Sequence, residues 1–209
     1  MIISVYFLYF TVAFSILFII AELLKRFANL PSDHTRKLIH VSSATLTVFL
    51  PVYLSQIEIV AMAILFSAFL TVSHLTKLLH ALHTVNRVTW GEVWFPIAVG
   101  ISAILFLPEN IKAFQFGFVV LGVSDTLAEY AGKYLKSKVL LQYNHKTLAG
   151  LLAFIVGTIA VSIAFKLNLN IDLIGAIILL GGIELFSTKG IDNLLVPLAA
   201  GGILLLAIA

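Results

Sequence analysis

Long apolar runs alternate with short polar breaks along the whole chain. Eight runs have the length and composition of helices, with approximate bounds 3–24, 38–55, 57–75, 91–107, 112–132, 148–166, 171–187 and 193–209. A helix needs about 20 apolar residues to cross the hydrocarbon core of a bilayer. The pattern predicts an all-α fold, a polytopic membrane bundle of about eight transmembrane helices in a single domain over residues 1–209. The first run is expected to be a retained helix, because no small-residue cleavage site precedes the next polar loop.

Composition supports a membrane protein and excludes several kinds of chemistry. The chain is 61% hydrophobic and only 11% charged, whereas soluble domains are about a quarter charged. It has no cysteine, which excludes disulfides, thiolate catalysis and cysteine-bound zinc. No basic run alternates with aromatic residues, so no nucleic-acid partner is expected.

The positive charges are unevenly divided between the two sets of connecting loops. Of the 13 Lys and Arg residues, only Lys112 and Lys166 fall in one set, and the other 11 fall in the opposite set; all six histidines lie toward the same side as those 11. Loops rich in Lys and Arg stay in the cytosol. The eight-span layout therefore predicts that both termini are non-cytosolic.

The segment between the third and fourth apolar runs has helical spacing of its own. Leu75, Leu78, Leu79 and Leu82 repeat at intervals of three and four residues, with Lys77, His80 and His83 elsewhere on the wheel. An amphipathic helix lying on the cytosolic surface has this pattern. A helical extension of the third run would explain it equally well.

Ionisable residues inside membrane segments are functional candidates, because lipid cannot solvate them. Arg36 and Lys37 open the second run, and His40 follows one turn later. Two cations at a helix start suit an incoming polyanion, which the backbone N–H groups there could also bind. The alternative is a simple positive flank on the cytosolic side.

A second group of polar residues lies deep in the fifth run. Asp125, Ala128, Glu129 and Gly132 form one stripe at i, i+3, i+4 and i+7. Two carboxylates one turn apart repel each other unless a cation or a proton lies between them. Magnesium is a candidate, since it is held by one or two carboxylates plus phosphate oxygens. A buried salt bridge to a neighbouring lysine is the alternative.

Further polar groups stand at three other helix ends. Lys146, Thr147 and Gly150 open the sixth run with residue types that suit a phosphate at a helix N-terminus. Glu184 lies near the end of the seventh run, Asp192 precedes the eighth, and Asn193 opens it. Asp192 could be a metal ligand or, after a turn at Gly190, a helix N-cap.

Gly91, Glu92 and Pro96 at the start of the fourth run add one more acidic position, for which the helix dipole is a sufficient explanation. All of these groups fall on the predicted cytosolic face. Together they supply carboxylates for a divalent cation and positive groups for phosphates, which are the parts that phosphoryl transfer requires.

In their order along the chain, the motifs resemble the polyprenol kinase family of integral membrane enzymes, which includes dolichol kinase, phytol kinase and CTP-dependent diacylglycerol kinases. The family's Arg-Lys pair with a following His is similar to Arg36, Lys37 and His40. Its three other motifs are similar to Asp125, Ala128 and Gly132, to Lys146, Thr147 and Gly150, and to Glu184, Asp192, Asn193 and Pro197. A Gly-acid-aromatic-Pro element of the phytol-kinase branch is similar to Gly91, Glu92, Phe95 and Pro96.

The resemblance implies transfer of a phosphoryl group from CTP to a membrane lipid alcohol, with Mg²⁺ as the cofactor and the site on the cytosolic face. Asp125 is the expected metal ligand, with Asp192 or Glu184, and the expected catalytic residues are Asp125, Lys146, His40 and Glu129. Nucleotide contacts are expected from Arg36, Lys37, Gly132, Lys146, Thr147, Gly150 and Asn193.

Several alternatives stay open. Ser124 stands where the family usually has glycine, which leaves the choice between CTP and another nucleoside triphosphate open. A cytidylyltransferase that makes CDP-activated lipid would use similar groups, and so would an ion-coupled transporter.

Overall fold

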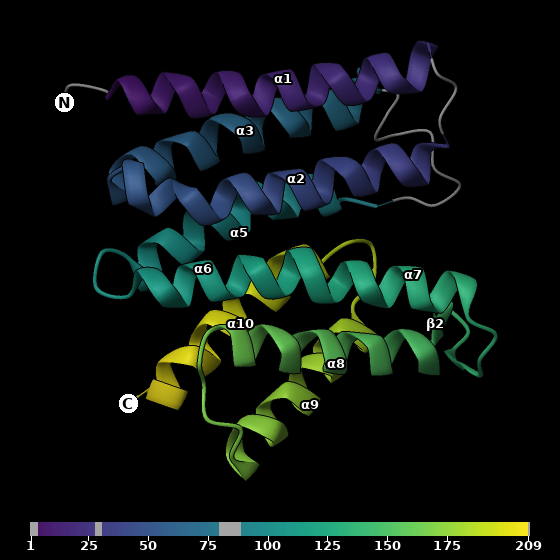
Figure 1. The fold of residues 1–209 in the computed structure, drawn as a ribbon. Coiled ribbons are helices and arrows are strands. Elements are labelled where there is room, and N and C mark those ends of the chain that lie inside the picture. The colour runs from purple at the N-terminus through teal and green to yellow at the C-terminus, as the bar shows by residue number, and fades with distance from the viewer. Residues whose placement is uncertain (1–3, 28–30, 80–88, 209) are drawn as a thin grey trace.

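The computed structural model describes residues 4–27, 31–79 and 89–208. Every apolar run predicted from the sequence is helical in it (Figure 1). The elements are α1 (Val5–Phe27), α2 (Ser32–Tyr53), α3 (Gln56–Thr76), α5 (Gly91–Phe106), α6 (Ile111–Val120), η1 (Leu121–Asp125), α7 (Thr126–Tyr134), β1 (Val139–Leu141), β2 (Lys146–Thr147), α8 (Leu148–Ala164), α9 (Ile171–Phe186) and α10 (Asp192–Ile208). Segments α6, η1 and α7 form one continuous helix, in which η1 is a π-helical turn.

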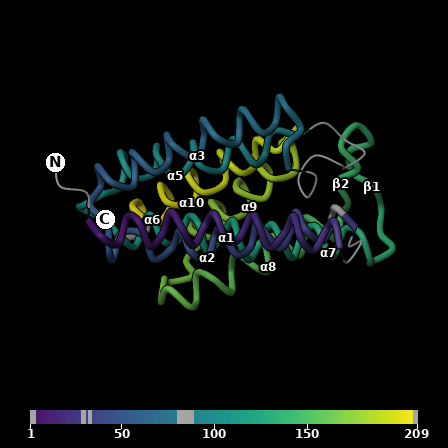
Figure 2. The backbone as a smooth tube through the Cα atoms, turned by 90° about the horizontal axis from the view of Figure 1, so that it is seen from above, coloured from purple at the N-terminus to yellow at the C-terminus, as the bar shows by residue number. Residues whose placement is uncertain are grey.

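The helices give the chain the character of a membrane protein. By length and composition, α1, α3 and the continuous helix 111–134 can cross a bilayer, whereas α5, α8 and α10 are apolar but shorter. The structure thus supports a membrane bundle. The number of eight transmembrane spans stays a prediction. The described part of α1 begins at the end of the bundle where α10 finishes (Figures 1 and 2). An even number of spans requires this arrangement.

Side chains divide into a packed interior and an apolar exterior. Phe114, Phe116, Phe118 and Phe154 are almost completely buried where α6 and α8 meet their neighbours, and α10 packs against α5, α6 and α9. Large apolar residues such as Leu8 and Ile64 are exposed on α1 and α3. An exterior of this kind is suited to contact with lipid.

Two glycines allow helices to approach backbone to backbone. A Cβ atom added at Gly117 in α6 would lie 2.3 Å from the carbonyl oxygen of Pro197 in α10. One added at Gly157 in α8 would lie 3.1 Å from the Cα atom of Ser124 in η1. Small residues make such close helix packing possible in membranes.

Local sequence explains where several helices begin. Ser55 and Glu58 form a reciprocal capping box at the start of α3. Asn110 and Asn170 accept backbone N–H bonds at the starts of α6 and α9. Side-chain oxygens of these types satisfy N–H groups that have no partner within the helix.

The position where α3 ends tests the two predictions for the amphipathic segment that follows it. The helix stops at Thr76, and Lys77 has a left-handed conformation with φ of 54°. The prediction that α3 extends further is therefore wrong for residues 77–79, and no surface helix begins within them either. The rest of that segment, with His80, Leu82 and His83, lies outside the described residues.

One feature departs from a purely helical fold. The basic loop predicted between residues 133 and 146 contains an antiparallel pair, β1 and β2, in which Val139 pairs with Thr147 and Leu141 with Lys146. The hairpin leads directly into α8, so it fixes the position from which Lys146 projects.

The approach of α6 to α10 gives a stability prediction. Gly117→Ala should destabilise the protein by roughly 1–3 kcal/mol, because the new methyl group overlaps the backbone of Pro197. The melting temperature in detergent should fall by roughly 2–10 °C. Gly202→Ala in α10 is the matched control, since a Cβ there meets nothing within 4 Å. Equal melting temperatures for the two variants would contradict this packing.

Candidate active site

A polar pocket of about 720 Å³ opens at the end of the bundle opposite the described start of α1 and end of α10. Pockets of this size accommodate small-molecule ligands. The pocket is lined by the starts of α2, α8 and α10, by η1 and α7, and by the end of α9. All the candidate site residues predicted from the sequence line it, namely Arg36, Lys37, His40, Asp125, Glu129, Gly132, Lys146, Thr147, Gly150, Glu184, Asp192 and Asn193. The predicted meeting of these groups is found, while their roles in chemistry stay a prediction.

Lys37 occupies the position between the two carboxylates of the fifth run. Its Nζ atom lies 2.8 Å from Asp125 Oδ2 and 3.1 Å from Glu129 Oε2. The Lys37 side chain is only 5% exposed and that of Asp125 only 11%. The cation between these carboxylates is thus an ammonium group. The salt bridge given as the alternative is present.

Arg36 forms an outer ion pair beside this one. Its Nη2 atom donates to Glu129 Oε1 at 2.8 Å, and both side chains are more than a fifth exposed. Partly exposed pairs of this kind contribute about 1 kcal/mol or less. Arg36 can therefore exchange its partner for a ligand at lower cost than Lys37.

His40 lies one turn deeper and faces the same carboxylate. Its Nε2 atom is 3.3 Å from Asp125 Oδ2, yet it makes no hydrogen bond with any described residue. The edge of the ring contacts Phe95 in α5, with centroids 6.2 Å apart. His40 is thus a mostly buried imidazole at the boundary between the polar pocket and apolar side chains.

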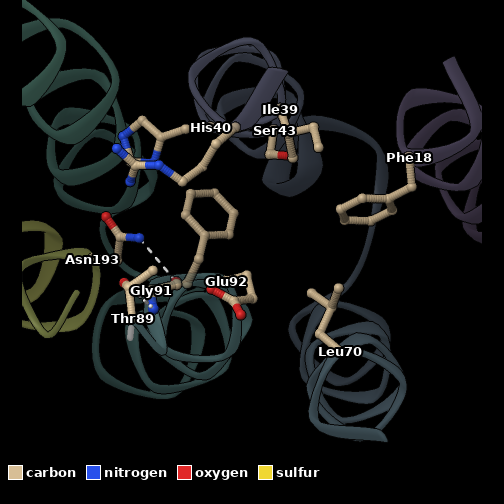
Figure 3. Close-up of a pocket in the computed structure, with 11 residues that line it drawn as sticks. Phe18, Ile39, His40, Ser43, Leu70, Thr89, Gly91, Glu92 and Asn193 are labelled. Atoms are coloured by element: carbon tan, nitrogen blue, oxygen red, sulfur yellow. Dashed lines mark hydrogen bonds between the residues drawn. The ribbon is translucent and has the colours of Figure 1, made fainter. Parts of the chain in front are cut away.

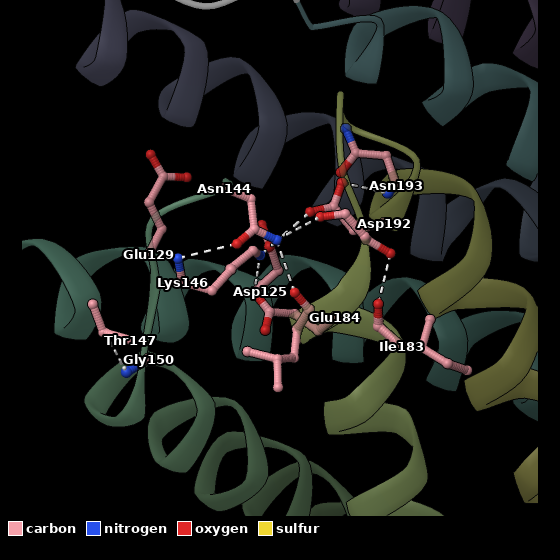
Figure 4. Close-up of polar contacts among 12 residues, drawn as sticks. Asp125, Glu129, Asn144, Lys146, Thr147, Gly150, Ile183, Glu184, Asp192 and Asn193 are labelled. Carbon is pink, nitrogen blue, oxygen red and sulfur yellow. Dashed lines mark hydrogen bonds and ion pairs between the residues drawn. The ribbon is translucent and has the colours of Figure 1, made fainter. Parts of the chain in front are cut away.

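Lys146 is the centre of a second group of charges. Its Nζ atom forms an ion pair with Glu184 and lies 3.8 Å from Asp192 Oδ2 (Figure 4). Burial by itself lowers the pKa of the Lys146 ammonium, but the carboxylates of Glu184 and Asp192 outweigh this effect and raise that pKa. Lys146 therefore remains a cation at neutral pH.

Asn144 holds the loop that carries Lys146. Its Nδ2 atom donates to the carbonyl of Leu185 at 2.9 Å, and its Oδ1 accepts from the backbone N–H of Lys146 at 3.3 Å (Figure 4). These bonds join the hairpin to the end of α9. Asn144 could not be identified from the sequence, because its importance depends on a contact 41 residues away.

Thr147 and the nearby glycines form the floor of the pocket. Thr147 Oγ1 accepts from the N–H of Gly150 at 3.1 Å, which makes Thr147 the N-cap of α8. A Cβ at Gly132 would lie 3.1 Å from that hydroxyl oxygen, and one at Gly150 would lie 3.0 Å from the carbonyl of Ala128. The stripe predicted in the fifth run therefore faces the pocket, and its small members allow α7 and α8 to meet.

The starts of α5 and α10 are joined by another close approach. Asn193 Nδ2 donates to the carbonyl of Gly91 at 2.9 Å. Gly190 has φ of +81°, and a Cβ there would lie 2.5 Å from the Cα of Gly91. The turn predicted at Gly190 is confirmed. Asn193 has a structural bond in addition to its predicted contact with nucleotide.

Asp192 was predicted as either a metal ligand or the N-cap of the last helix. It is the first residue of α10, and its Oδ1 accepts from the N–H of Asn193 at 3.1 Å. Its Oδ2 faces Lys146 in the pocket. Asp192 is thus the first helical residue and not the N-cap before the helix, and its role as a metal ligand stays a prediction.

The π-helical turn η1 and the contacts of Glu92 were not predicted. Asp125 is the last residue of η1, and π turns inserted in α-helices occur frequently at functional sites. Glu92 Oε1 lies 2.7 Å from His74 Nδ1, and the His74 ring lies against Trp90. Glu92 thus faces α3, beside the polar pocket.

The acidic side chains do not form a complete protein cage for a metal ion, but they suit an ion that is also bound by phosphate. Within the described ranges, no three His, Asp or Glu side chains are grouped as a metal cage. Asp125 and Asp192 nevertheless line the same pocket from η1 and α10. One or two carboxylates, completed by water and phosphate oxygens, are the usual protein ligands of Mg²⁺. The donor set therefore fits a magnesium ion that arrives with a polyphosphate.

Comparison with known proteins finds a lipid kinase among the similar sequences. A phytol kinase of Synechocystis sp. is 28% identical over 191 residues, which covers 86% of this chain and 82% of that protein. An uncharacterised protein of Methanocaldococcus jannaschii is 39% identical over 66 residues, 32% of each chain. No family model and no solved structure matches the chain. Over most of its length, the chain is thus similar to a phytol kinase, which supports the resemblance to the polyprenol kinase family.

Proposed function

We propose that this protein is a membrane phosphotransferase that moves the terminal phosphoryl group of a nucleoside triphosphate, CTP in the first instance, to the hydroxyl of a lipid alcohol. The observation that carries the proposal is a set of three cations that form ion pairs with four carboxylates in one pocket at the end of an apolar bundle. The members are Arg36, Lys37, Lys146, Asp125, Glu129, Glu184 and Asp192. The similarity to a phytol kinase supports the same class of reaction.

The cations would bind and neutralise the polyphosphate. Arg36 and Lys146 are more accessible than the buried Lys37, and Lys146 is a cation held between two carboxylates. Phosphate oxygens would replace some of the carboxylate contacts that these cations now make. Because the cationic side chains are already held in place, binding would cost little additional conformational entropy. Catalysis of phosphoryl transfer depends mostly on such positioning and neutralisation of charge.

A magnesium ion would be held by Asp125 and Asp192, and when bound it would neutralise charge on the phosphates. Glu184 would keep Lys146 oriented. His40 stands beside Asp125 with Nε2 making no hydrogen bond to a described residue. It is therefore the group best suited to accept the proton of the acceptor hydroxyl. Glu129, which is bound by both Arg36 and Lys37, is less suited to that role.

The proposal also covers the side of the membrane on which the pocket opens and the lipid alcohol that accepts the phosphoryl group. The charge distribution favours a cytosolic pocket. Phytol, geranylgeraniol, a dolichol-like alcohol and diacylglycerol are the acceptors to compare.

The reaction is tested with purified protein in detergent, CTP labelled on its γ-phosphate, Mg²⁺ and each of the four acceptors. We expect a labelled lipid monophosphate and an equal amount of CDP. A repeat with ATP, GTP and UTP establishes the donor. Chelation of Mg²⁺ should abolish the product, because an ion held by only one or two carboxylates is easily removed and its positive charge on the phosphates is then lost.

The products separate the alternatives. Release of pyrophosphate with a CDP-lipid would show a cytidylyltransferase. Substrate-driven ion currents without nucleotide turnover would favour a transporter. Folded protein that labels none of the acceptors with any donor would contradict the proposed function.

Asp192→Asn tests the metal-binding part of the proposal. The variant should lower kcat by on the order of a hundredfold, and it should raise the Mg²⁺ concentration needed for half-maximal activity. Its melting temperature should change little, because Asp192 is only a distant partner of Lys146 at 3.8 Å. Asp172→Asn is the matched control, since Asp172 is exposed in the first turn of α9. An Asp192→Asn enzyme with normal Mg²⁺ dependence would show that Asp192 is not a metal ligand.

A further inference from the structure

Two small cavities continue from the polar pocket into the apolar part of the bundle. The inner cavity, about 50 Å³, shares Arg36, His40, Thr89 and Asn193 with the polar pocket. The deep cavity, about 40 Å³, shares Phe18, Ser43, Leu70 and Phe95 with the inner one. Because each space shares lining residues with the next, the three spaces adjoin one another from the polar pocket inward.

The lining of this path changes from polar to apolar along its length. In Figure 3, His40 and Asn193 lie on one side of the inner cavity, and Phe18 and Leu70 lie on the other. The deep cavity is lined by apolar side chains from α1, α2, α3 and α5, together with Ser43 and Thr47. Along α2, the path extends from Arg36 to Leu50, which is about 21 Å at a rise of 1.5 Å per residue.

Aromatic rings of α1 cover the path along the seam between α2 and α3. Phe14 and Phe18 contact Phe66 in α3, with ring centroids 5.4 and 6.2 Å apart. Elsewhere α2 packs against α1 and α6, and α3 packs against α5. The narrow space between these helices is therefore bounded by side chains.

We propose that this seam between α1, α2, α3 and α5 binds the hydrocarbon chain of the acceptor, with its hydroxyl at His40. The proposal rests on the proposed function and specifies its substrate class. The two cavities are narrow, so the occupant is an alcohol with a single chain and not a diacylglycerol with two.

The polar end supplies a site for the hydroxyl. His40 Nε2 lies where the inner cavity meets the polar pocket, close to Asp125 and without a hydrogen bond to any described residue. A hydroxyl there could donate its hydrogen to the imidazole while its chain follows Phe95 and Ser43 inward. The apolar chain would be removed from water along the whole path, which favours binding in proportion to the area buried.

The first experiment compares Ser43→Leu with Thr45→Leu, using phytol and the five-carbon alcohol 3-methylbut-2-en-1-ol as acceptors. Ser43 is buried and lines both cavities, so an isobutyl group there would obstruct the path. The KM for phytol should rise roughly tenfold more than the KM for the short alcohol, as expected for one overpacked contact. Thr45 is exposed on the same helix, and its variant should behave as the unmodified protein.

An equal change for both acceptors would overturn the proposal. So would phosphorylation of dioleoylglycerol with a kcat/KM equal to that for phytol.

A second measurement does not depend on turnover or on the folding of a variant. A phytol analogue with a diazirine at the end distant from its hydroxyl is photolysed with the unmodified protein, and the labelled peptides are identified. We expect label on α1, α2 or α3 around Phe14, Leu50 and Met62, and competition by phytol.

Label confined to α8 or α9 would overturn the seam as the site. If the protein transfers no phosphoryl group but the label falls on the seam, the lipid site stands and the proposed function fails.

Discussion

The ammonium group of Lys37, held between Asp125 and Glu129, is the interaction on which the rest of the site depends. Both carboxylates belong to one helix, the lysine belongs to another, and the Lys37–Asp125 contact is almost completely buried. In a membrane bundle, an unpaired charge at this position would be costly, and removal of one member of a buried pair typically costs about 3–5 kcal/mol. The pairing therefore fixes α2 against η1 and α7 in one register.

The same balance of charge explains how a pocket with many ionised groups can exist before any ligand arrives. Three of the cations have carboxylate partners, Arg36 and Lys37 at one wall and Lys146 at the other. The partners differ in exposure, from the buried Asp125 to the more accessible Glu129. A polyanion can therefore compete for the outer contacts while the inner contact maintains the fold. This division supports the proposal that a nucleotide binds at the open side and a lipid alcohol approaches from the seam.

Much of this arrangement could be predicted from the sequence. The apolar runs predicted the helices, because a segment in lipid must satisfy its backbone hydrogen bonds internally, as a helix does. The stripe from Asp125 to Gly132 gave the face of α7 that lines the pocket, because helical periodicity is a local property. The turn at Gly190 was also predictable, and its positive φ confirms it.

Other features depend on contacts between distant segments and could not be predicted in this way. Asn144 acts through carbonyls at the end of α9, and Gly91 matters because Gly190 and Asn193 approach it. The salt-bridge partner of Asp125 could be predicted as a lysine, but not which lysine, because both Lys37 and Lys146 were candidates. The π-helical turn and the path beside Phe95 also follow from packing between helices. Such packing cannot be predicted from a single sequence.

The central claim is that the charged pocket binds a polyphosphate together with Mg²⁺. Its most direct test is equilibrium binding of β,γ-imido-CTP, which cannot transfer its terminal group, to the purified protein in detergent over a range of Mg²⁺ and salt concentrations. We predict saturable binding that requires Mg²⁺, weakens as salt rises, and is lost in Lys146→Met. Folded protein that fails to bind this analogue, and fails equally with the corresponding ATP, GTP and UTP analogues, would contradict the account.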